Sequence, residues 1–234
     1  MSFVLPSPAV PSVAVAASDD RFPVRRILCV GRNYADHARE MGADPDREPP
    51  FFFAKPGDAA VAAAGTVPYP TGTHRLEHEI ELVVAIGVGG SSISAASALD
   101  HVWGYGVGVD LTRRDLQQEA KDARRPWDVA KGFDASAPVS PLVPARSAFG
   151  GGAPDHGRVW LAVDGETRQD GDLRDLIWPV ADVVAAASEW WRLAPGDLIF
   201  TGTPAGVGPL EPGAVVTGGV DGVGGFSFVV GDAR

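Results

Sequence analysis

One segment, Leu76–Ile86, limits the possible folds more than any other part of the chain, and its sequence is LEHEIELVVAI. It begins with alternating residues and ends in an apolar run, which predicts a β-strand that enters the core. Because successive side chains of a strand point to opposite faces, Glu77, Glu79 and Glu81 share one face and His78 lies on the other. Three like charges within about 13 Å of one another on one face repel unless a cation or basic side chains neutralise them.

Two interpretations of these carboxylates follow from the strand alone. They could form a solvated face at the edge of a sheet, or they could bind a divalent cation. Hard oxygen ligands suit Mg²⁺, Mn²⁺ or Ca²⁺ better than Zn²⁺. Asp110 favours the metal site, because it ends the glycine-spaced strand Trp103–Val109 and the ends of elements often line clefts.

The composition favours many short strands joined by turns. Glycine (29) and proline (20) account for 49 of the 234 residues, well above the usual share of about 12%, which argues against a helical bundle. We expect a mixed α/β, mainly β, single domain over residues 24–234. A proline-broken extension over residues 1–23 should add a strand packed on the core. Helices are expected at about Asn33–Met41, Leu111–Lys121 and Pro179–Trp191, and a polar loop or lid at Ala43–Pro50.

The charge of the chain excludes several classes of partner. With 20 Lys and Arg against 30 Asp and Glu, the net charge is −10, which argues against binding to nucleic acid or to an anionic membrane. No stretch approaches the ~18 apolar residues of a membrane-spanning helix. The single cysteine, Cys29, lies in an apolar run and excludes an internal disulfide framework. No Lys or Arg precedes Arg21, so a signal peptide is not indicated and a cytoplasmic protein is expected.

Three further signals suggest chemistry, each with a plain structural alternative. His37 and Glu40 stand three apart on a predicted helix, where a carboxylate can make the imidazole a better base, although many such pairs are surface ion pairs. Lys131 lies in a weakly charged stretch. The loop Thr201–Gly208 offers N–H groups and hydroxyls to an anion, but an ordinary turn would look the same. The glycines at 104, 106 and 108 lack the third glycine of a dinucleotide fingerprint.

Taken together, six segments in the same order resemble the fumarylacetoacetate hydrolase family. They are Gly31–Glu40, Phe53–Pro56, His78–Leu82, Gly104–Gln117, Ala130–Asp134 and Gly196–Pro204. The resemblance covers roughly residues 24–230, and the length is similar to the single-domain acylpyruvase branch. Arg47–Phe53 resembles in particular the bacterial members that hydrolyse fumarylpyruvate.

The resemblance implies a fold, a cofactor and a set of site residues. The fold would be a β-roll or sandwich with short peripheral helices, assembled as a homodimer. Mg²⁺ or Mn²⁺ would be held by Glu79, Glu81 and Asp110, which leaves Glu77 as an outer or surface residue. His37 and Glu40 would activate water on a helix that orders over bound substrate. The positions implied to contact substrate oxygens are Arg114, Gln117, Lys131 and Thr203. Gly132 stands where family members often have serine.

The implied reaction is hydrolysis of the C3–C4 bond of a 2,4-dioxo acid. The expected substrate is fumarylpyruvate, cleaved to fumarate and pyruvate in gentisate-type aromatic breakdown. Water activated by His37 would attack C4, and Lys131 with Arg114 or Gln117 would stabilise the oxyanion. On the same fold, an alternative is a decarboxylase or isomerase of oxaloacetate or larger oxo-diacids. A non-catalytic metal- or ligand-binding protein is an alternative of another class, against which the pairing of His37 with Glu40 argues.

Overall fold

The computed structural model describes residues 3–40 and 49–233, apart from the side chains of Ala38 and Glu40. Residues 43–48 of the predicted loop therefore lie outside the described residues. The strands are β1 (Ser12–Ala14), β2 (Arg21–Pro23), β3 (Arg26–Gly31), β4 (Phe51–Pro56), β5 (Ala60–Ala62), β6 (Ala64–Tyr69), β7 (Leu76–His78), β8 (Ile80–Ile86), β9 (Val102–Val109), β10 (Thr112–Arg113), β11 (Ala137–Val139), β12 (Val143–Pro144), β13 (Arg158–Val163), β14 (Glu166–Asp172), β15 (Asp197–Phe200), β16 (Gly208–Pro209), β17 (Val215–Val220) and β18 (Gly224–Ala233). The α-helices are α1 (Ala35–Glu40), α2 (Arg114–Asp122), α3 (Asp128–Lys131) and α4 (Val180–Trp190), and Ala95–His101 is a 3₁₀ helix.

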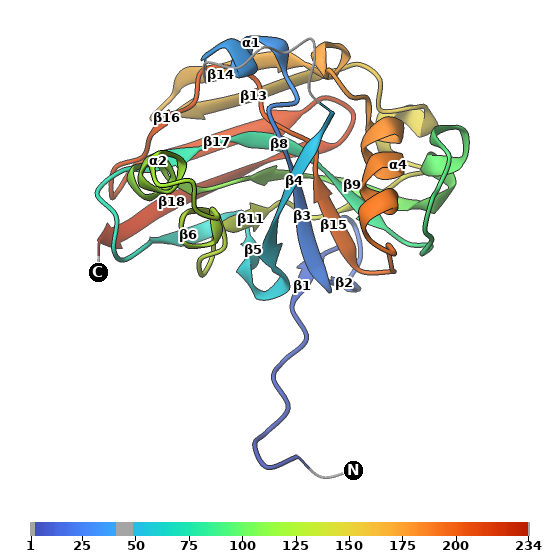
Figure 1. Cartoon of the computed structure of the whole chain (residues 1–234), viewed down its shortest axis with the longest axis horizontal. Coiled ribbons are helices and arrows are strands. Elements are labelled where there is room, and N and C mark those ends of the chain that lie inside the picture. The colour runs from blue at the N-terminus through green and yellow to red at the C-terminus, as the bar shows by residue number, and fades with distance from the viewer. Residues whose placement is uncertain (1–2, 41–48, 234) are drawn as a thin grey trace.

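Two large sheets enclose the main core, which confirms the predicted, mainly β architecture with short peripheral helices (Figure 1). The larger sheet has the order β4-β3-β15-β8-β9-β11-β5, with β12 paired to β9, and the smaller has the order β14-β13-β17-β18-β6. Leu82 of β8, Leu161 of β13 and Phe228 of β18 belong to one buried cluster, so the core lies between the sheets. Helix α4 contributes Val183 and Ala187 to the same cluster, and no described helix is long and apolar enough to cross a membrane.

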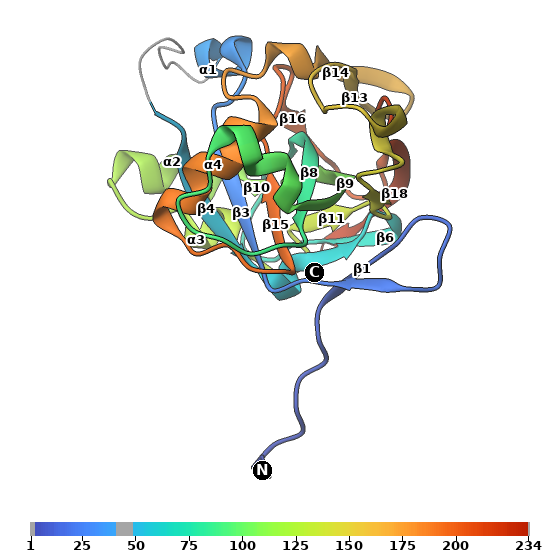
Figure 2. The same ribbon diagram turned by 90° about the vertical axis from the view of Figure 1, so that its right-hand side faces the viewer.

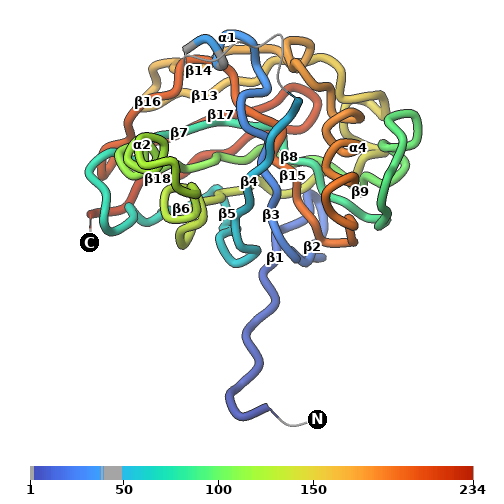
Figure 3. Tube along the Cα trace, viewed as in Figure 1, coloured from blue at the N-terminus to red at the C-terminus, as the bar shows by residue number. Residues whose placement is uncertain are grey.

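A second core covers the outer face of the larger sheet. Cys29, Val83 and Phe200 are buried there against Phe22 of the β1–β2 hairpin, and burial raises the pKa of the Cys29 thiol. Residues 3–10 before this hairpin are exposed and extend away from the rest of the chain (Figures 2 and 3). The larger sheet is therefore buried on both faces, as a fully apolar strand such as Val83–Ile86 requires.

The segment that we predicted as one strand is divided between two sheets. Strand β7 lies in a small sheet with the order β10-β7-β16, whereas β8 lies between β15 and β9 in the larger sheet. Glu79 is the junction between them. Along β8, Leu82 and Val84 enter the main core while Val83 enters the second core, so the predicted alternation holds. The junction brings the carboxylate face to the end of the sheet rather than to a solvated edge.

Glycines at two places in the fold are required by close packing or by the geometry of a turn. A Cβ atom on Gly108 would lie 2.6 Å from the Phe200 ring and from Cγ2 of Val83, so the glycine allows neighbouring strands to pack and does not form a phosphate-binding turn. Asp164 and Gly165 have φ of 51° and 82°. They connect β13 and β14 as a two-residue hairpin, whose turn type needs positive φ at both positions.

Candidate active site

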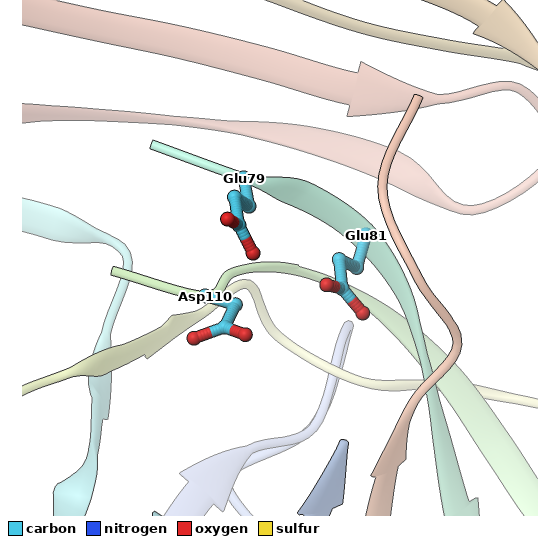
Figure 4. A group of neighbouring side chains, drawn as sticks. All are labelled: Glu79, Glu81 and Asp110. Atoms are coloured by element: carbon cyan, nitrogen blue, oxygen red, sulfur yellow. The ribbon is translucent and has the colours of Figure 1, made fainter. Parts of the chain in front are cut away.

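Three carboxylates lie close together at the end of β7, the beginning of β8 and the end of β9. Glu79 joins β7 to β8, Glu81 is the second residue of β8, and Asp110 follows β9 directly. The Asp110 N–H donates a hydrogen bond of 2.8 Å to the Glu79 carbonyl, which holds the two segments together. All three are buried, and one oxygen from each lies within 4.8 Å of the others (Figure 4). Such a set of hard oxygen atoms fits Mg²⁺ or Mn²⁺.

Lys131, the last residue of α3, neutralises part of this charge. Its Nζ atom donates to Glu79 Oε2 and Asp110 Oδ2, each at 2.8 Å, and lies 4.9 Å from the centroid of the Phe53 ring. Burial lowers the pKa of Lys131, but the charges of Asp110 and Glu79 outweigh burial and raise it overall. Burial likewise raises the pKa of Glu79, and the nearby cations outweigh it and hold that pKa below its usual value. Lys131 is therefore a charged group at the centre of the site, although Gly132 follows it where family members often have serine.

Glu81 differs from its two neighbours because no basic side chain of the described residues forms an ion pair with it. Its Oε2 atom accepts a hydrogen bond from the Gly202 N–H. Burial and the charges of Asp110 and Glu79 raise the pKa of Glu81 well above its usual value. The cations of residues 3–40 and 49–233 thus leave the Glu81 carboxylate without a direct ion pair. A divalent cation among the three would neutralise it, so the donor set fits the metal that the sequence implies.

Arg114 and Gln117 lie on one face of α2 beside the carboxylates. The Arg114 guanidinium donates to Glu77, Glu79 and the Gln117 side-chain oxygen. Glu77 is only 2% exposed and also accepts from Arg75 at 2.8 Å. Glu77 was expected to be an outer or surface residue; it lies outside the triad but is buried, so the surface alternative is wrong. It is buried because the guanidinium that reaches Glu79 needs a second carboxylate to balance and orient it.

Lys55, for which no role was predicted, has a completely buried side chain beside the carboxylates. Its Nζ atom lies 2.8 Å from Asp110 Oδ1 and donates to the carbonyls of Leu111 and Lys131. Asp110 is therefore held between two lysines, because Lys131 contacts its other oxygen. A lysine inside the apolar strand FFFAKP was the only signal, since a charged side chain in such a strand needs a buried partner.

His37 lies on α1 and is 5% exposed, with its charge close enough to Glu79 to lower that pKa. The approach to α1 is held by Asn33, a residue to which the sequence analysis gave no role. The Asn33 side chain donates to the carbonyls of Trp178 and Thr201 and accepts from the Trp178 N–H at 2.7 Å. Glu40 is the last residue of α1, but its side chain lies outside the described residues, so its pairing with His37 stays a prediction.

Thr203 is oriented by two residues behind the site. Gln169 of β14 is fully buried, and its Nε2 atom donates to Thr203 Oγ1 at 2.8 Å and to the Pro204 carbonyl. Its Oε1 atom accepts from the Ile80 N–H and contacts His78 Nδ1 at 2.9 Å. These partners fix the orientation of the amide. Because Thr203 Oγ1 accepts a hydrogen bond from Gln169, its own hydrogen is left to donate to a ligand.

One cavity collects these side chains. It is lined by Val30, Gly31, Arg32, His37, Phe51, Phe53, Glu79, Glu81, Arg114, Gln117, Lys121, Trp127, Lys131 and Thr203. The structure therefore brings together all the predicted site residues whose side chains it describes, with Asp110 directly beneath the lining. His78 points to the other side of the strand, towards Gln169, as the alternation predicts.

The family model described as fumarylacetoacetate hydrolase C-terminal matches residues 26–230. Mitochondrial oxaloacetate tautomerases of Arabidopsis thaliana and Homo sapiens are 40% and 39% identical over 205 and 206 residues, which cover 88% of this chain and 90% and 91% of those proteins. An oxaloacetate decarboxylase of Dictyostelium discoideum is 39% identical over 200 residues, covering 85% of this chain and 90% of that protein.

Two solved structures match almost the whole chain. Fumarylpyruvate hydrolase from Pseudomonas aeruginosa, in complex with Mn²⁺ and pyruvate, is 50% identical with a TM-score of 0.95, and the match covers 98% of this chain and 99% of that one. A structure from Burkholderia cenocepacia described as a candidate fumarylpyruvate hydrolase is 62% identical with a TM-score of 0.93, covering 100% of this chain and 96% of that one.

Proposed function

The chain belongs to the fumarylacetoacetate hydrolase family, and we propose that it is a metal-dependent hydrolase that cleaves fumarylpyruvate to fumarate and pyruvate. The observation that carries this proposal is the single cavity in which His37 and Lys131 lie beside three buried carboxylates. The similar Pseudomonas aeruginosa enzyme, which binds Mn²⁺ and pyruvate, supports the same substrate class.

Glu79, Glu81 and Asp110 would hold Mg²⁺ or Mn²⁺. When bound, such an ion supplies a Lewis acid that polarises the oxo group of a substrate. The side chains around the triad determine how the substrate is bound. Arg114 has N–H groups beyond those used by its three protein partners, and Thr203 has a hydroxyl hydrogen to donate. With Gln117 they would bind the carboxylate end of a 2,4-dioxo acid.

His37 would take a proton from water as the water oxygen bonds to C4 of the substrate. Lys131 has three donors on Nζ, of which two contact carboxylates, so the third can stabilise the oxyanion that develops at C4. One such donor typically contributes about 3–4 kcal/mol. The C3–C4 bond then breaks, the acyl group leaves as a carboxylic acid, and C3 takes the proton that His37 holds. Glu40 is proposed as the group that orients His37.

A substrate panel tests this proposal. Fumarylpyruvate, maleylpyruvate, acetylpyruvate and oxaloacetate are each assayed with Mg²⁺ and with Mn²⁺. Loss of the absorbance of the enolised acylpyruvate, with equal release of pyruvate, is expected for fumarylpyruvate above the others. A protein that binds Mn²⁺ but turns over none of these acids would refute the proposal and favour a non-catalytic binding protein.

A second candidate is chemistry on oxaloacetate, and the oxaloacetate tautomerases and decarboxylase of 39–40% identity favour it. The same Lewis acid and the same base could move a proton at C3 or release carbon dioxide. Enol-to-keto conversion of oxaloacetate is followed by absorbance, and decarboxylation by carbon dioxide release. Either rate above that for fumarylpyruvate hydrolysis would identify oxaloacetate as the substrate.

The proposal extends to the setting of the enzyme. Residues 24–234 would form one catalytic domain, and of the extension over residues 1–23 only the β1–β2 hairpin would pack on its core. The enzyme would be a cytoplasmic homodimer acting in gentisate-type aromatic breakdown. Light scattering after size-exclusion chromatography tests the dimer, since a monomer at working concentration would contradict it.

A further inference from the structure

The cavity contains a second pair of cations that the reaction at C4 does not use. Arg32 precedes α1 and Lys121 lies near the end of α2, and both line the same cavity as Glu79 and Lys131. Lys121 is seven residues beyond Arg114, so the two lie on one face of α2 with their Cα atoms about 10 Å apart along the axis. Lys121 is thus separated by about two turns of α2 from Arg114, which is proposed to bind the carboxylate end of the substrate.

Each of these cations lies over an aromatic ring. The Arg32 guanidinium carbon is 5.5 Å from the centroid of Phe51, and Lys121 Nζ is 5.5 Å from that of Trp127. The two rings contact each other edge to face, with centroids 5.6 Å apart. The ring contact therefore brings two positive groups to one end of the cavity.

No carboxylate among the described residues forms an ion pair with Lys121. Burial, together with the charges of Arg114 and Arg32, lowers the pKa of Lys121. Cations gathered in this way repel one another, and an anion bound between them would remove the repulsion. Since Lys131 already pairs with Glu79 and Asp110, an anionic ligand beside Lys121 would offset this repulsion.

We propose that Arg32 and Lys121 form a subsite for the distal carboxylate of a dicarboxylic acylpyruvate, with Phe51 and Trp127 as its apolar walls. This inference rests on the proposed function, because the pyruvyl end of the substrate is taken to lie at the triad. A diacid such as fumarylpyruvate has carboxylates at both ends of a seven-carbon chain, roughly 7 Å apart when extended. The subsite would therefore select diacids over monoacids such as acetylpyruvate.

The test compares two substrates in matched variants. Lys121→Met and Arg32→Met remove a charge and keep a long side chain. Each variant removes a hydrogen bond between a charged side chain and the distal carboxylate, so the ratio of kcat/KM for fumarylpyruvate to that for acetylpyruvate should fall about 10- to 150-fold. Arg146→Met, an exposed residue outside the cavity, is the control for net charge and should keep the wild-type ratio.

Inhibition gives a second readout that needs no turnover. Fumarate should bind the wild type more tightly than crotonate, in which a methyl group replaces one carboxylate, and the difference should be lost in Lys121→Met. Circular dichroism checks folding, and Lys121→Gln is the alternative if Lys121→Met is misfolded. An unchanged substrate ratio in both variants, or equal binding of fumarate and crotonate by the wild type, overturns the subsite. A wild type that hydrolyses no acylpyruvate overturns the proposed function, and the binding comparison still decides the subsite.

Discussion

Replacing Lys55 by methionine removes a charge from the most buried part of the site while keeping the length of the side chain. The Lys55 side chain has no exposed surface and lies 2.8 Å from Asp110 Oδ1, whose side chain is equally buried. Lys55 also donates to the carbonyls of Leu111 and Lys131. Methionine would therefore leave a buried carboxylate with a single lysine partner and two buried carbonyls with one hydrogen bond fewer.

Breaking a buried ion pair from one side typically costs about 3–5 kcal/mol, because an uncompensated charge remains. For a chain of this size, each kcal/mol lowers the melting temperature by about 2–4 °C. The metal-free Lys55→Met variant should therefore melt about 6–20 °C below the wild type. Mn²⁺ should narrow this gap, since the ion compensates Asp110 and would bind more tightly to a triad that has lost a neighbouring cation.

Urea denaturation with and without Mn²⁺ measures both effects. Arg158→Met is the matched control, because Arg158 pairs with Asp170 at the same 2.8 Å but the two side chains are 48% and 55% exposed. The control should show no resolvable change, as is usual for exposed pairs. If the free energy of unfolding of metal-free Lys55→Met is less than about 1 kcal/mol below that of the wild type, burial of this ion pair does not govern its contribution to stability. If Mn²⁺ does not reduce the difference in stability between Lys55→Met and the wild type, Lys55 and the metal site are not linked.

Four further predictions concern the site. Asp110→Asn should lose Mn²⁺ binding by calorimetry together with turnover, and unchanged activity in metal-free buffer would contradict the assignment of the ligands. His37→Ala should keep Mn²⁺ affinity but lose kcat by about 10²–10⁴-fold; near-wild-type turnover would argue against its role as base. Gln169→Leu should raise KM more than it lowers kcat, because it frees the Thr203 hydroxyl to turn away from the substrate, and kcat falling alone would count against this. Burial and two neighbouring carboxylates raise the pKa of Glu81, so Mn²⁺ must displace a proton from it in order to bind. The affinity for Mn²⁺ should therefore rise with pH, from the usual carboxyl range up through the raised pKa of Glu81. An affinity that does not change with pH would exclude this link between Mn²⁺ binding and proton release.

The periodicity of one strand predicted a large part of the fold and of the site. Alternation in Leu76–Ile86 placed Glu79 and Glu81 on one face and His78 on the other, and the structure agrees because side-chain direction in a strand is set by the local backbone. The same logic could not locate the division at Glu79. That division depends on the pairing of β7 with β10 and β16, which are remote in sequence.

The residues that sequence reasoning missed share long-range partners. Lys55 contacts Asp110, 55 residues later, and Gln169 contacts His78, 91 residues earlier. A buried lysine or glutamine is tolerated only when the fold supplies such partners, so its own neighbourhood in the sequence says little about its role. Glu77 was misplaced for the same reason, because its burial depends on Arg114 of α2 rather than on its strand.

The distribution of charge at the site explains how an acidic chain could bind the anionic substrate that we propose. The net charge is −10, but charges in solvent are screened beyond about 8 Å at physiological ionic strength. A ligand in the cavity therefore responds mainly to the groups that line it. Those include Arg32, Arg114, Lys121 and Lys131, and a divalent ion would neutralise most of the charge of the opposing carboxylates. The cavity can then attract a diacid although the chain as a whole repels anions, and this local excess of positive charge is what the Arg32 and Lys121 variants remove.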